Sequence, residues 1–415
     1  MKKILVVLVV LLTVAIVAVA AFGVYIVVGQ PGQPQATPTA IGQQGHHKHR
    51  TPTPGTDLTP TVFGSPVATG MPYVQGDQII DGAGHPLILH GAQIESPFNY
   101  IQSWQSGKQP SQMLNSTVFN QMAQDWKMNV LRLPISNWIY AKDTANYMSK
   151  LDQVIQEANA AGLYVVLDLH DDAKSGSPYG DTADLPKSEN ISFWQAIASH
   201  YKNNPMVMYD PYNEPKARDW QTWLHGGGTV NGAKIVGFQD LVDAIRSTGS
   251  KQIIVVEPGS AGSSNSSNVN AAEEGGWATV GNNLINDPNI VYSLHVYEGI
   301  LLTAQQQDAK WGPILNHHPI FYGEWALLTN GYGQSGVNHC KNVVHSQADQ
   351  DVTAFLNYMA SRHASWAAWQ FEPHFLIQNY TSFAPSTLDT PWTCGDTTSY
   401  AGMGSIVKQF LTTGQ

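Results

Sequence analysis

From Tyr73 onward, short apolar runs alternate with longer segments in which apolar residues recur every three or four positions. The short runs are rich in β-branched and aromatic residues and predict strands, whereas the periodic segments predict amphipathic helices. Strands that alternate with helices are typical of parallel βαβ units. The expected strands span residues 87–94, 129–133, 164–169, 207–213, 252–256, 290–296, 319–324 and 366–371. The expected helices include residues 148–161, 192–201, 233–247 and 350–361.

Eight parallel strands can close into a (β/α)8 TIM barrel, which takes roughly 200 to 400 residues. Residues 73–415 fall within that range, so we predict one α/β domain there. Ahead of the first strand, residues 74–86 predict a β-hairpin that turns at Asp81-Gly82 and closes the barrel floor. Pro211 cannot donate a hydrogen bond in a sheet, so we expect the fourth strand to bend or end there.

The N-terminal region is apolar from Ile4 to Val28 and follows two lysines. A run of this length can cross a bilayer as an uncleaved signal anchor, since about 20 helical residues suffice. The small residues of Ala18-Val-Ala20 are equally typical of a cleaved signal peptide. We keep both readings for residues 1–28. Both predict an extracellular protein, either secreted or anchored to the cell surface, with a membrane contact only through residues 4–28 if they are uncleaved.

Residues 29–72 are rich in Pro, Thr and Gln and lack hydrophobic periodicity, which predicts an extended linker before the barrel.

Cys340 and Cys394 are the only two cysteines in the chain. Two cysteines in an exported protein are usually joined, so we expect a disulfide between them. Two unpaired thiols are the alternative.

The net charge of −10 is unevenly distributed, because residues 1–72 carry four basic residues against one acidic residue. The rest of the chain is therefore acidic and should repel nucleic acid and anionic lipid surfaces. Only 13% of all residues are charged, while the chain contains 12 Trp and 17 Tyr. This composition favours neutral, ring-shaped and hydroxyl-rich ligands over ionic ones.

Acidic residues gather near the carboxyl ends of the expected strands, which meet on one face of a barrel. Any one of them could be a solvated or ion-paired loop charge. They are Glu95, Asp171, Asp172, Glu214, Glu257, Glu298, Glu324 and Glu372.

Glu214 and Glu324 differ from the other six in their neighbours. Asn213 can hold a sugar hydroxyl beside Glu214, and Gly323 allows a substrate to approach the backbone beside Glu324. Arg132, on the second expected strand, can pair with a buried carboxylate and keep it ionised, although a structural ion pair would also explain it. Two facing carboxylates are the minimum that cleavage of a glycosidic bond requires.

From about Tyr73 to the C-terminus, the chain resembles the cellulase family of retaining glycoside hydrolases, glycoside hydrolase family 5 of clan A. Each motif of this resemblance is short, but together and in family order they are specific. They are Leu131-Arg-Leu-Pro134, Leu167-Asp-Leu-His170, Tyr212-Asn-Glu-Pro215, His295-Val-Tyr297, Tyr322-Gly-Glu-Trp325 and Trp366-Ala-Ala-Trp369.

The resemblance implies that Glu214 is the acid/base and Glu324 the nucleophile. It also implies that Asn213 binds the sugar 2-hydroxyl and that Arg132 and Tyr297 support Glu324. By the same resemblance, His170 and His295 contact the substrate and the catalytic carboxylates. Trp369 is implied to form the floor of subsite −1. A strand-end histidine is often only a polar core residue, so the two histidine roles depend on the other motifs.

The tryptophans divide by their place in the pattern. Those that follow strands are expected to line the cleft and stack on sugar rings. They are Trp104, Trp138, Trp220, Trp223, Trp277, Trp325 and Trp392, of which we expect about half to do so. Trp126, Trp194 and Trp366 fall in helical or strand-internal positions and are expected in the core.

The leading expectation is a monomeric hydrolase that cleaves β-glycosidic bonds of a polysaccharide by double displacement, as an endo-β-1,4-glucanase does. Mannan, xylan, β-1,3-glucan and glycolipid remain open, because loops choose the glycan. A surface glycan-binding protein without turnover is disfavoured by the intact pair of glutamates. A metal-dependent hydrolase would need ligands beyond His170 and His295. The mechanism requires no metal or organic cofactor.

Overall fold

The computed structural model describes residues 70–98, 113–170, 185–217, 219–230, 232–258, 276–297, 300, 302–327, 348–372, 375–377 and 403–414. The expected membrane or signal segment, most of the linker, Cys340 and Cys394 lie outside these residues. Among the helices of the described ranges, none is long and apolar enough to cross a membrane.

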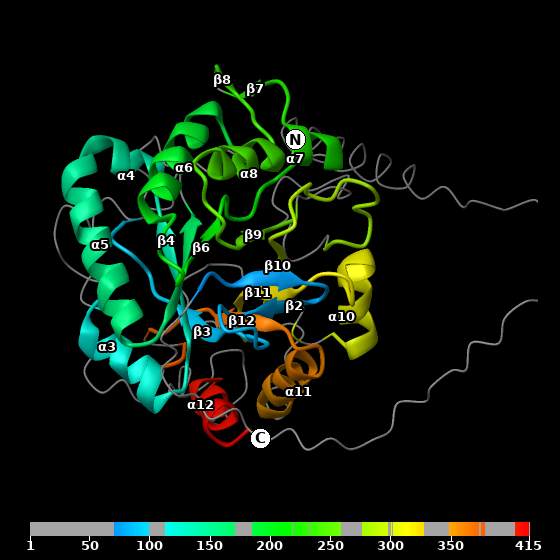
Figure 1. Ribbon diagram of the computed structural model, residues 1–415. Helices are drawn as coiled ribbons and strands as arrows, with labels where there is room; N and C mark the ends of the chain where they lie inside the picture. Colours follow the sequence, from blue (N-terminus) through cyan, green and yellow to red (C-terminus); the bar gives the residue numbers. More distant parts are fainter. Residues whose placement is uncertain are drawn as a thin grey trace, which may run out of the picture. The chain divides into compact units, whose positions relative to one another are not determined.

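Eight parallel strands form a closed barrel in which each strand pairs with its neighbours in chain order and β12 pairs with β3 (Figure 1). The strands are β3 (His90–Gln93), β4 (Val130–Ile135), β5 (Tyr164–Leu169), β6 (Val207–Asp210), β9 (Ile254–Val256), β10 (Ile290–Val296), β11 (Ile320–Trp325) and β12 (Ser365–Ala368). The (β/α)8 barrel predicted from the sequence is therefore confirmed.

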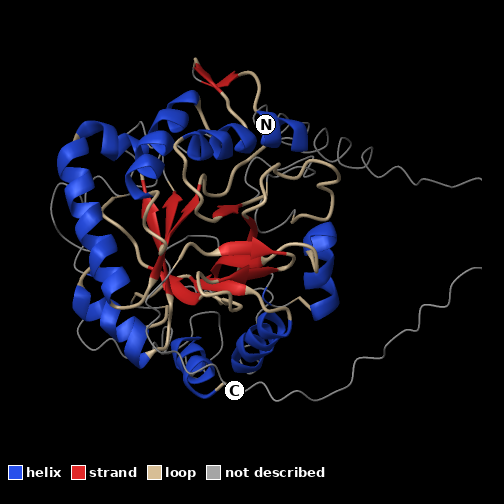
Figure 2. Cartoon of the chain, in the orientation of Figure 1, coloured by secondary structure: helices blue, strands red, loops and turns tan. Residues whose placement is uncertain are grey.

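Helices lie around the outside of the barrel (Figure 2). They are α3 (Ser116–Asn120), α4 (Asn137–Lys142), α5 (Thr144–Ala160), α6 (Ser188–Tyr201), α7 (Trp220–His225), α8 (Phe238–Ser247), α10 (Ala304–Trp311), α11 (Ala348–Ser361) and α12 (Met403–Thr413), with short helical turns η2 (Gln121–Asp125) and η4 (Gly312–Ile314). In α5, Tyr147, Leu151, Ile155 and Ala158 recur at helical spacing and are buried. Apolar stripes of this kind pack the helices onto the strands.

The strand boundaries agree with the sequence pattern for two strands that are mostly apolar. Residues 164–169 and 290–296 form strands over the predicted ranges. β6 ends at Asp210, immediately before Pro211, as predicted. Within the expected helix 233–247, Ala233–Lys234 instead forms β8, which pairs with β7 (Thr229–Val230).

The N-terminal hairpin turns at a different place from the one predicted. β1 (Tyr73–Gln75) and β2 (Gln78–Ile80) pair antiparallel, so the tight turn is Gly76-Asp77, with Gly76 at φ 63°. A second reversal follows, in which Asp81 Oδ1 accepts the N–H groups of Ala83 and His85. Asp81-Gly82 therefore belongs to the second of two turns.

Ile79 of β2 packs beneath the barrel, as expected of a hairpin that closes the floor. It belongs to one apolar layer with inward-facing residues from the lower ends of the strands. These include Leu89, Val130, Tyr164, Val166, Met208, Val255, Val291, Phe321 and Ala367.

On four strands the barrel interior becomes polar two residues further along, at the next position on the same face of the strand. The apolar and polar partners are Val130 and Arg132, Val166 and Asp168, Met208 and Asp210, and Val255 and Glu257. All four polar side chains are fully buried. The upper half of the barrel therefore holds a cluster of charges above the apolar floor.

Candidate active site

Glu324 lies at the upper end of β11 and is 2% exposed. Its Oε1 accepts a hydrogen bond from Arg132 Nη1 at 2.6 Å, and its Oε2 accepts one from the Tyr297 hydroxyl at 2.5 Å. Both oxygens of the Glu324 carboxylate are thus held by hydrogen-bond donors. The supporting positions of Arg132 and Tyr297 around Glu324 are those that the family resemblance implies.

An irregular register between β10 and β11 turns Glu324 into the barrel. Leu294 pairs with Tyr322 but His295 pairs with Glu324, so Gly323 is the extra residue of a bulge. A bulge re-aims the side chains that follow it. A Cβ on Gly323 would lie 2.7 Å from Ser293 Oγ and 2.9 Å from His295 Nε2. Gly323 thus makes room for these two side chains, rather than for a substrate as the sequence suggested.

Glu214 lies beyond the end of β6, and its side chain is 24% exposed. Its backbone has a φ of 45°, the left-handed region that residues other than Gly rarely adopt. The Glu214 N–H donates to Glu257 Oε2 at 2.6 Å. Strained backbone of this kind clusters at functional sites.

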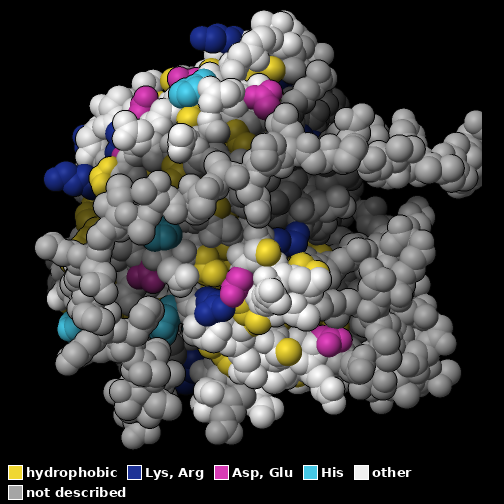
Figure 3. All heavy atoms as spheres, turned by 90° about the vertical axis from the view of Figure 1, so that its right-hand side faces the viewer, with side chains coloured by type: hydrophobic (Ala, Val, Ile, Leu, Met, Phe, Trp, Pro, Cys, Tyr) yellow, Lys and Arg dark blue, Asp and Glu magenta, His cyan; other side chains and the backbone are white. Residues whose placement is uncertain are grey.

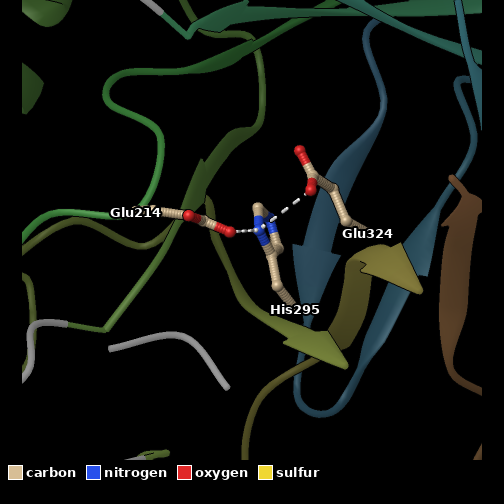
Figure 4. A group of neighbouring side chains, drawn as sticks. All are labelled: Glu214, His295 and Glu324. Carbon is tan, nitrogen blue, oxygen red and sulfur yellow. Dashed lines mark hydrogen bonds and ion pairs between the residues drawn. The ribbon is translucent and has the colours of Figure 1, made fainter. Parts of the chain in front are cut away.

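His295 lies between the two glutamates, as Figure 4 shows. Its Nδ1 is 2.8 Å from Glu214 Oε1 and 3.5 Å from Glu324 Oε2. Its Nε2 is 2.9 Å from Glu257 Oε1. One oxygen of Glu214 and one of Glu324 lie within 4.8 Å of each other. The two glutamates from distant parts of the chain are therefore neighbours at one end of the barrel.

Beneath this pair, the Arg132 guanidinium contacts three more buried carboxylates. Its Nη2 lies 3.0 Å from Asp210 Oδ2 and 3.0 Å from Glu257 Oε1, and its Nη1 lies 3.1 Å from Asp168 Oδ2. Burial alone would lower the pKa of Arg132, but the surrounding carboxylate charges raise it well above its ordinary value. Arg132 is therefore a permanent positive charge under the nucleophile.

Burial and neighbouring charges shift the pKa of two further groups of the cluster. Burial raises the pKa of Asp210 well above its ordinary range, and the charge of Glu257 adds to this effect. Burial tends to lower the pKa of His295, but the charges of Glu257 and Glu324 and the hydrogen bond to Glu214 raise it well above its ordinary value.

His170 follows β5 and is oriented by Asp168, whose Oδ2 lies 2.7 Å from His170 Nδ1. Burial acts to lower the pKa of His170, but the charge and hydrogen bond of Asp168 raise it to about 8. Its Nδ1 is also 3.8 Å from Glu324 Oε1. The cluster thus brings together three basic side chains, each with a raised pKa. They are Arg132, His170 and His295.

Trp369 follows β12 and lies beside the histidine. Its ring is stacked near that of His170, with centroids 6.1 Å apart, and the Tyr297 ring meets it edge-on at 6.4 Å. Trp369 is 9% exposed. Asn213 completes the group, because its Oδ1 accepts a hydrogen bond from Arg132 Nη2 at 3.0 Å. The structure therefore brings all eight residues implied by the resemblance to one place.

In the described part of the chain, two sets of side chains have the donor spacing of a metal site. One is Glu214, His295 and Glu324, and the other is Asp168, Asp210 and Glu257. In the second set, the Arg132 guanidinium already lies within 3.1 Å of each of the three carboxylates. In the first set, His295 Nδ1 is already engaged with Glu214 Oε1 at 2.8 Å.

The prediction that Trp325 lines the cleft is wrong. Its side chain is fully buried and packs edge-on against Phe355 of α11 and Trp366 of β12. Because Glu324 points into the barrel, its neighbour must point outward to the helices. Trp138 lies on α4, where Lys142 Nζ is 3.5 Å from its ring centre, and its contact with substrate stays a prediction.

Three further tryptophans expected near the cleft are core residues. Trp220, Trp223 and Trp277 contact one another through stacked and edge-on rings and are at most 8% exposed. Trp126, Trp194 and Trp366 are fully buried, as predicted. Trp104, Trp392, Asp171, Asp172 and Glu298 lie outside the described residues.

Sequence reasoning missed Asp168 and Asp210 as parts of the site. Both stand inside apolar strands, so they were not among the strand-end acids. The sequence feature that could have identified them is a single carboxylate at an inward position of a buried strand. Burial of an unpaired charge there would cost too much free energy for the fold to be stable. Such a residue requires a partner, which here is Arg132.

Comparisons with known proteins agree with this geometry. A family model described as cellulase, glycosyl hydrolase family 5, matches residues 84–375. Endoglucanase E-5 of Thermobifida fusca is 25% identical over 351 residues, which cover 82% of this chain and 64% of that protein. Endoglucanase Z of Dickeya dadantii is 26% identical over 251 residues, which cover 60% of this chain and 49% of that protein. The chain thus spans about half to two thirds of the length of these relatives.

Solved structures share the barrel. The β-glucanase SdGluc5_26A of Saccharophagus degradans has a TM-score of 0.60 at 22% identity, covering 82% of this chain and 92% of that one. The catalytic domain of Thermobifida fusca endoglucanase Cel5A has a TM-score of 0.54 at 20% identity, covering 83% of this chain and 98% of that one. At these identities the likeness establishes the fold.

Proposed function

Since the chain belongs to the cellulase family, glycosyl hydrolase family 5, we propose that it hydrolyses β-glycosidic bonds of a polysaccharide with retention of configuration. One observation carries this proposal. A carboxylate oxygen of Glu214 lies within 4.8 Å of one of Glu324. Retaining glycosidases place their two carboxyl groups about 5 to 5.5 Å apart, whereas inverting enzymes need about 6.5 to 9.5 Å to admit a water.

The reaction begins when Glu214 donates its proton to the glycosidic oxygen. The bond from the anomeric carbon to that oxygen breaks, and a Glu324 oxygen forms a new bond to the anomeric carbon. In the second step, Glu214 removes a proton from water, whose oxygen displaces Glu324 from the same carbon. Two inversions return the original configuration.

The surrounding residues divide the remaining tasks. Arg132 and Tyr297 hold the Glu324 carboxylate in position by their hydrogen bonds. Asn213 accepts from Arg132 through its carbonyl oxygen, so its amide nitrogen is the group that we assign to the sugar 2-hydroxyl. Trp369, beside His170, is the apolar platform for the sugar ring in subsite −1.

We propose β-1,4-glucan as the substrate and endo cleavage as the mode of attack. The curated relatives named above are endoglucanases, and the β-glucanase of Saccharophagus degradans has been solved with cellotetraose. A neutral polymer also suits a chain in which 13% of residues are charged. On the face drawn in Figure 3, the described charged side chains are scattered among uncharged ones.

A panel of defined polysaccharides tests the proposal, with wild type and Glu324→Gln as a matched pair. The panel contains β-1,4-glucan, mannan, xylan and β-1,3-glucan. Release of reducing sugar from β-1,4-glucan should be fastest in wild type and nearly absent in the variant. A fall in viscosity that precedes the release of reducing ends indicates endo action. Equal activity of Glu324→Gln would contradict the nucleophile assignment, and preference for another glycan would correct the substrate.

We also propose that the enzyme acts outside the cell, because a polysaccharide is too large to enter it. Residues 4–28 supply the membrane or signal segment for export. Sequencing the N-terminus of the mature protein distinguishes a cleaved signal peptide from an anchor.

Thiol titration of the unfolded protein before and after reduction tests the disulfide between Cys340 and Cys394. Two reactive thiols before reduction would exclude the disulfide.

A further inference from the structure

Glu257 follows β9 directly, and its side chain is fully buried below the catalytic pair. Its carboxylate has three neighbours. Oε2 accepts the backbone N–H of Glu214 at 2.6 Å, while Oε1 lies 3.0 Å from Arg132 Nη2 and 2.9 Å from His295 Nε2. Trp223 Nε1 donates to the Glu257 carbonyl oxygen at 2.9 Å and fixes its backbone. Glu257 thus contacts the main chain of Glu214 and two side chains, those of Arg132 and His295, that also lie beside Glu324.

The contact with Glu214 supports a strained conformation. A left-handed backbone is unfavourable for a residue with a Cβ, because the Cβ comes close to the following carbonyl oxygen. Hydrogen bonds to a carboxylate are shorter and stronger than those between neutral groups, so the 2.6 Å bond from the Glu214 N–H offsets this cost. The direction in which Glu214 leaves the end of the barrel therefore depends on the Glu257 carboxylate.

The contact with His295 determines where protons lie. A carboxylate accepts hydrogen bonds, so His295 Nε2 must carry hydrogen to face Glu257 Oε1. His295 Nδ1 then faces Glu214 Oε1, 2.8 Å away. Because Oε1 of Glu214 is engaged with the imidazole, Oε2 is the oxygen that we assign to the leaving group.

We propose that Glu257 is a positioning residue, which holds the backbone of Glu214 and, through His295, sets the Glu214 oxygen that protonates the leaving group. This inference rests on the proposed glycoside hydrolysis. It assigns Glu257 to the acid/base half of the site, although Glu257 also touches Arg132 beneath the nucleophile.

Glu257→Gln is the most selective perturbation, because it keeps the size of the side chain. All three partners of Glu257 donate hydrogen bonds, whereas a glutamine amide has one accepting oxygen and one donating nitrogen. The nitrogen must therefore face either the Glu214 N–H or the pair Arg132 and His295. Either arrangement disturbs Glu214.

Asp210→Asn is the matched control. Asp210 is as buried as Glu257 and belongs to the same cluster, and its Oδ2 accepts from Arg132 Nη2 at 3.0 Å. Its described hydrogen bonds lead to Arg132 rather than to Glu214 or His295. The control therefore disturbs the cluster without removing the acceptor for Glu214.

The test compares two aryl β-cellobiosides that differ in their need for acid catalysis. A 2,4-dinitrophenyl group leaves without a proton, whereas a phenyl group needs one. Since kcat/KM reports the glycosylation step, Glu257→Gln should lower it for the phenyl substrate at least about tenfold more than for the dinitrophenyl substrate. Asp210→Asn should lower kcat/KM for both substrates by similar factors.

Equal losses on both substrates in Glu257→Gln would overturn the positioning role. Failure of wild type to hydrolyse either substrate would instead overturn the proposed function, and the positioning role with it. Thermal unfolding shows whether the variants fold. If Glu257→Gln does not fold, Glu257→Asp keeps the charge but shortens the reach to Glu214, and it should give the same dependence on the leaving group. If Glu257→Asp shows no such dependence on the leaving group, the positioning role is overturned as well.

Discussion

Gly323→Ala tests whether the bulge in β11 makes room for His295. The new methyl group would lie 2.9 Å from His295 Nε2 and 2.7 Å from Ser293 Oγ. Contacts of a carbon atom normally begin near 3.5 Å, so relief of both contacts takes a movement of roughly 0.6 Å at His295 and roughly 0.8 Å at Ser293. Gly323 does not have the left-handed backbone that would itself oppose a side chain. Steric contact alone therefore decides the outcome.

Two effects of different size should follow from this displacement. Adding a methyl group to a packed interior costs about 1–3 kcal/mol, so urea unfolding should show a loss of stability in this range. His295 is 2.8 Å from Glu214 Oε1, and its movement displaces the acid/base. Because misplacement of reacting groups by about 1 Å can cost about 100-fold in rate, kcat/KM should fall about 10- to 100-fold.

Two further variants separate these effects. Gly323→Ala combined with Ser293→Ala relieves the nearer contact, so it should recover stability in part while kcat/KM stays low. Ala367→Val overpacks the apolar floor of the barrel, away from the glutamates, and should lower stability with kcat/KM near that of wild type. A folded Gly323→Ala enzyme with the kcat/KM of wild type would refute the reasoning.

Three other predictions follow from the charges and the tryptophans. His170 has its pKa raised from 6.5 to about 8, so its ion pair with Asp168 is complete below pH 6.5 and is lost as the pH rises through 8. Wild type should lose about 2 kcal/mol of unfolding free energy over this window, and urea unfolding of His170→Asn should lack this loss; equal pH slopes would contradict the ion pair. Arg132→Met leaves buried carboxylates without a counter-charge and should cost about 3–5 kcal/mol by urea unfolding, and a change below 1 kcal/mol would count against the cluster. Trp325→Phe should leave kcat/KM within about twofold, whereas Trp369→Ala should lower it at least about tenfold, and the reverse order would restore Trp325 to the cleft.

The fold could be predicted because burial on both faces makes parallel strands nearly continuous in apolar residues. This explains the agreement for residues 164–169 and 290–296. The hairpin was less predictable, because Gly76-Asp77 and Asp81-Gly82 are both turn signals. The packing of Ile79 beneath the barrel selects Gly76-Asp77 for the tight turn. That packing joins residues far apart in the sequence, so the local turn signals do not reveal it.

Site residues could be predicted from the sequence where they stand at the carboxyl end of an expected strand. Glu214 and Glu324 follow from position and neighbours alone. Trp325 was assigned wrongly to the cleft. Whether a side chain after Gly323 points into the barrel or toward the helices depends on the bulge, and only the pairing of β11 with β10 reveals that bulge. Asp168 was missed because its partner Arg132 lies on another strand, and the reach of a guanidinium across the barrel is a three-dimensional fact.

The central claim is that Glu214 and Glu324 cleave the glycosidic bond by double displacement. Proton NMR of a cello-oligosaccharide digest, recorded before mutarotation, observes the anomeric configuration of the new reducing end directly. If the two glutamates act in this way, the β-anomer appears first and the α-anomer accumulates only later. An α-anomer that appears first would contradict it, because one displacement without a covalent intermediate inverts the configuration.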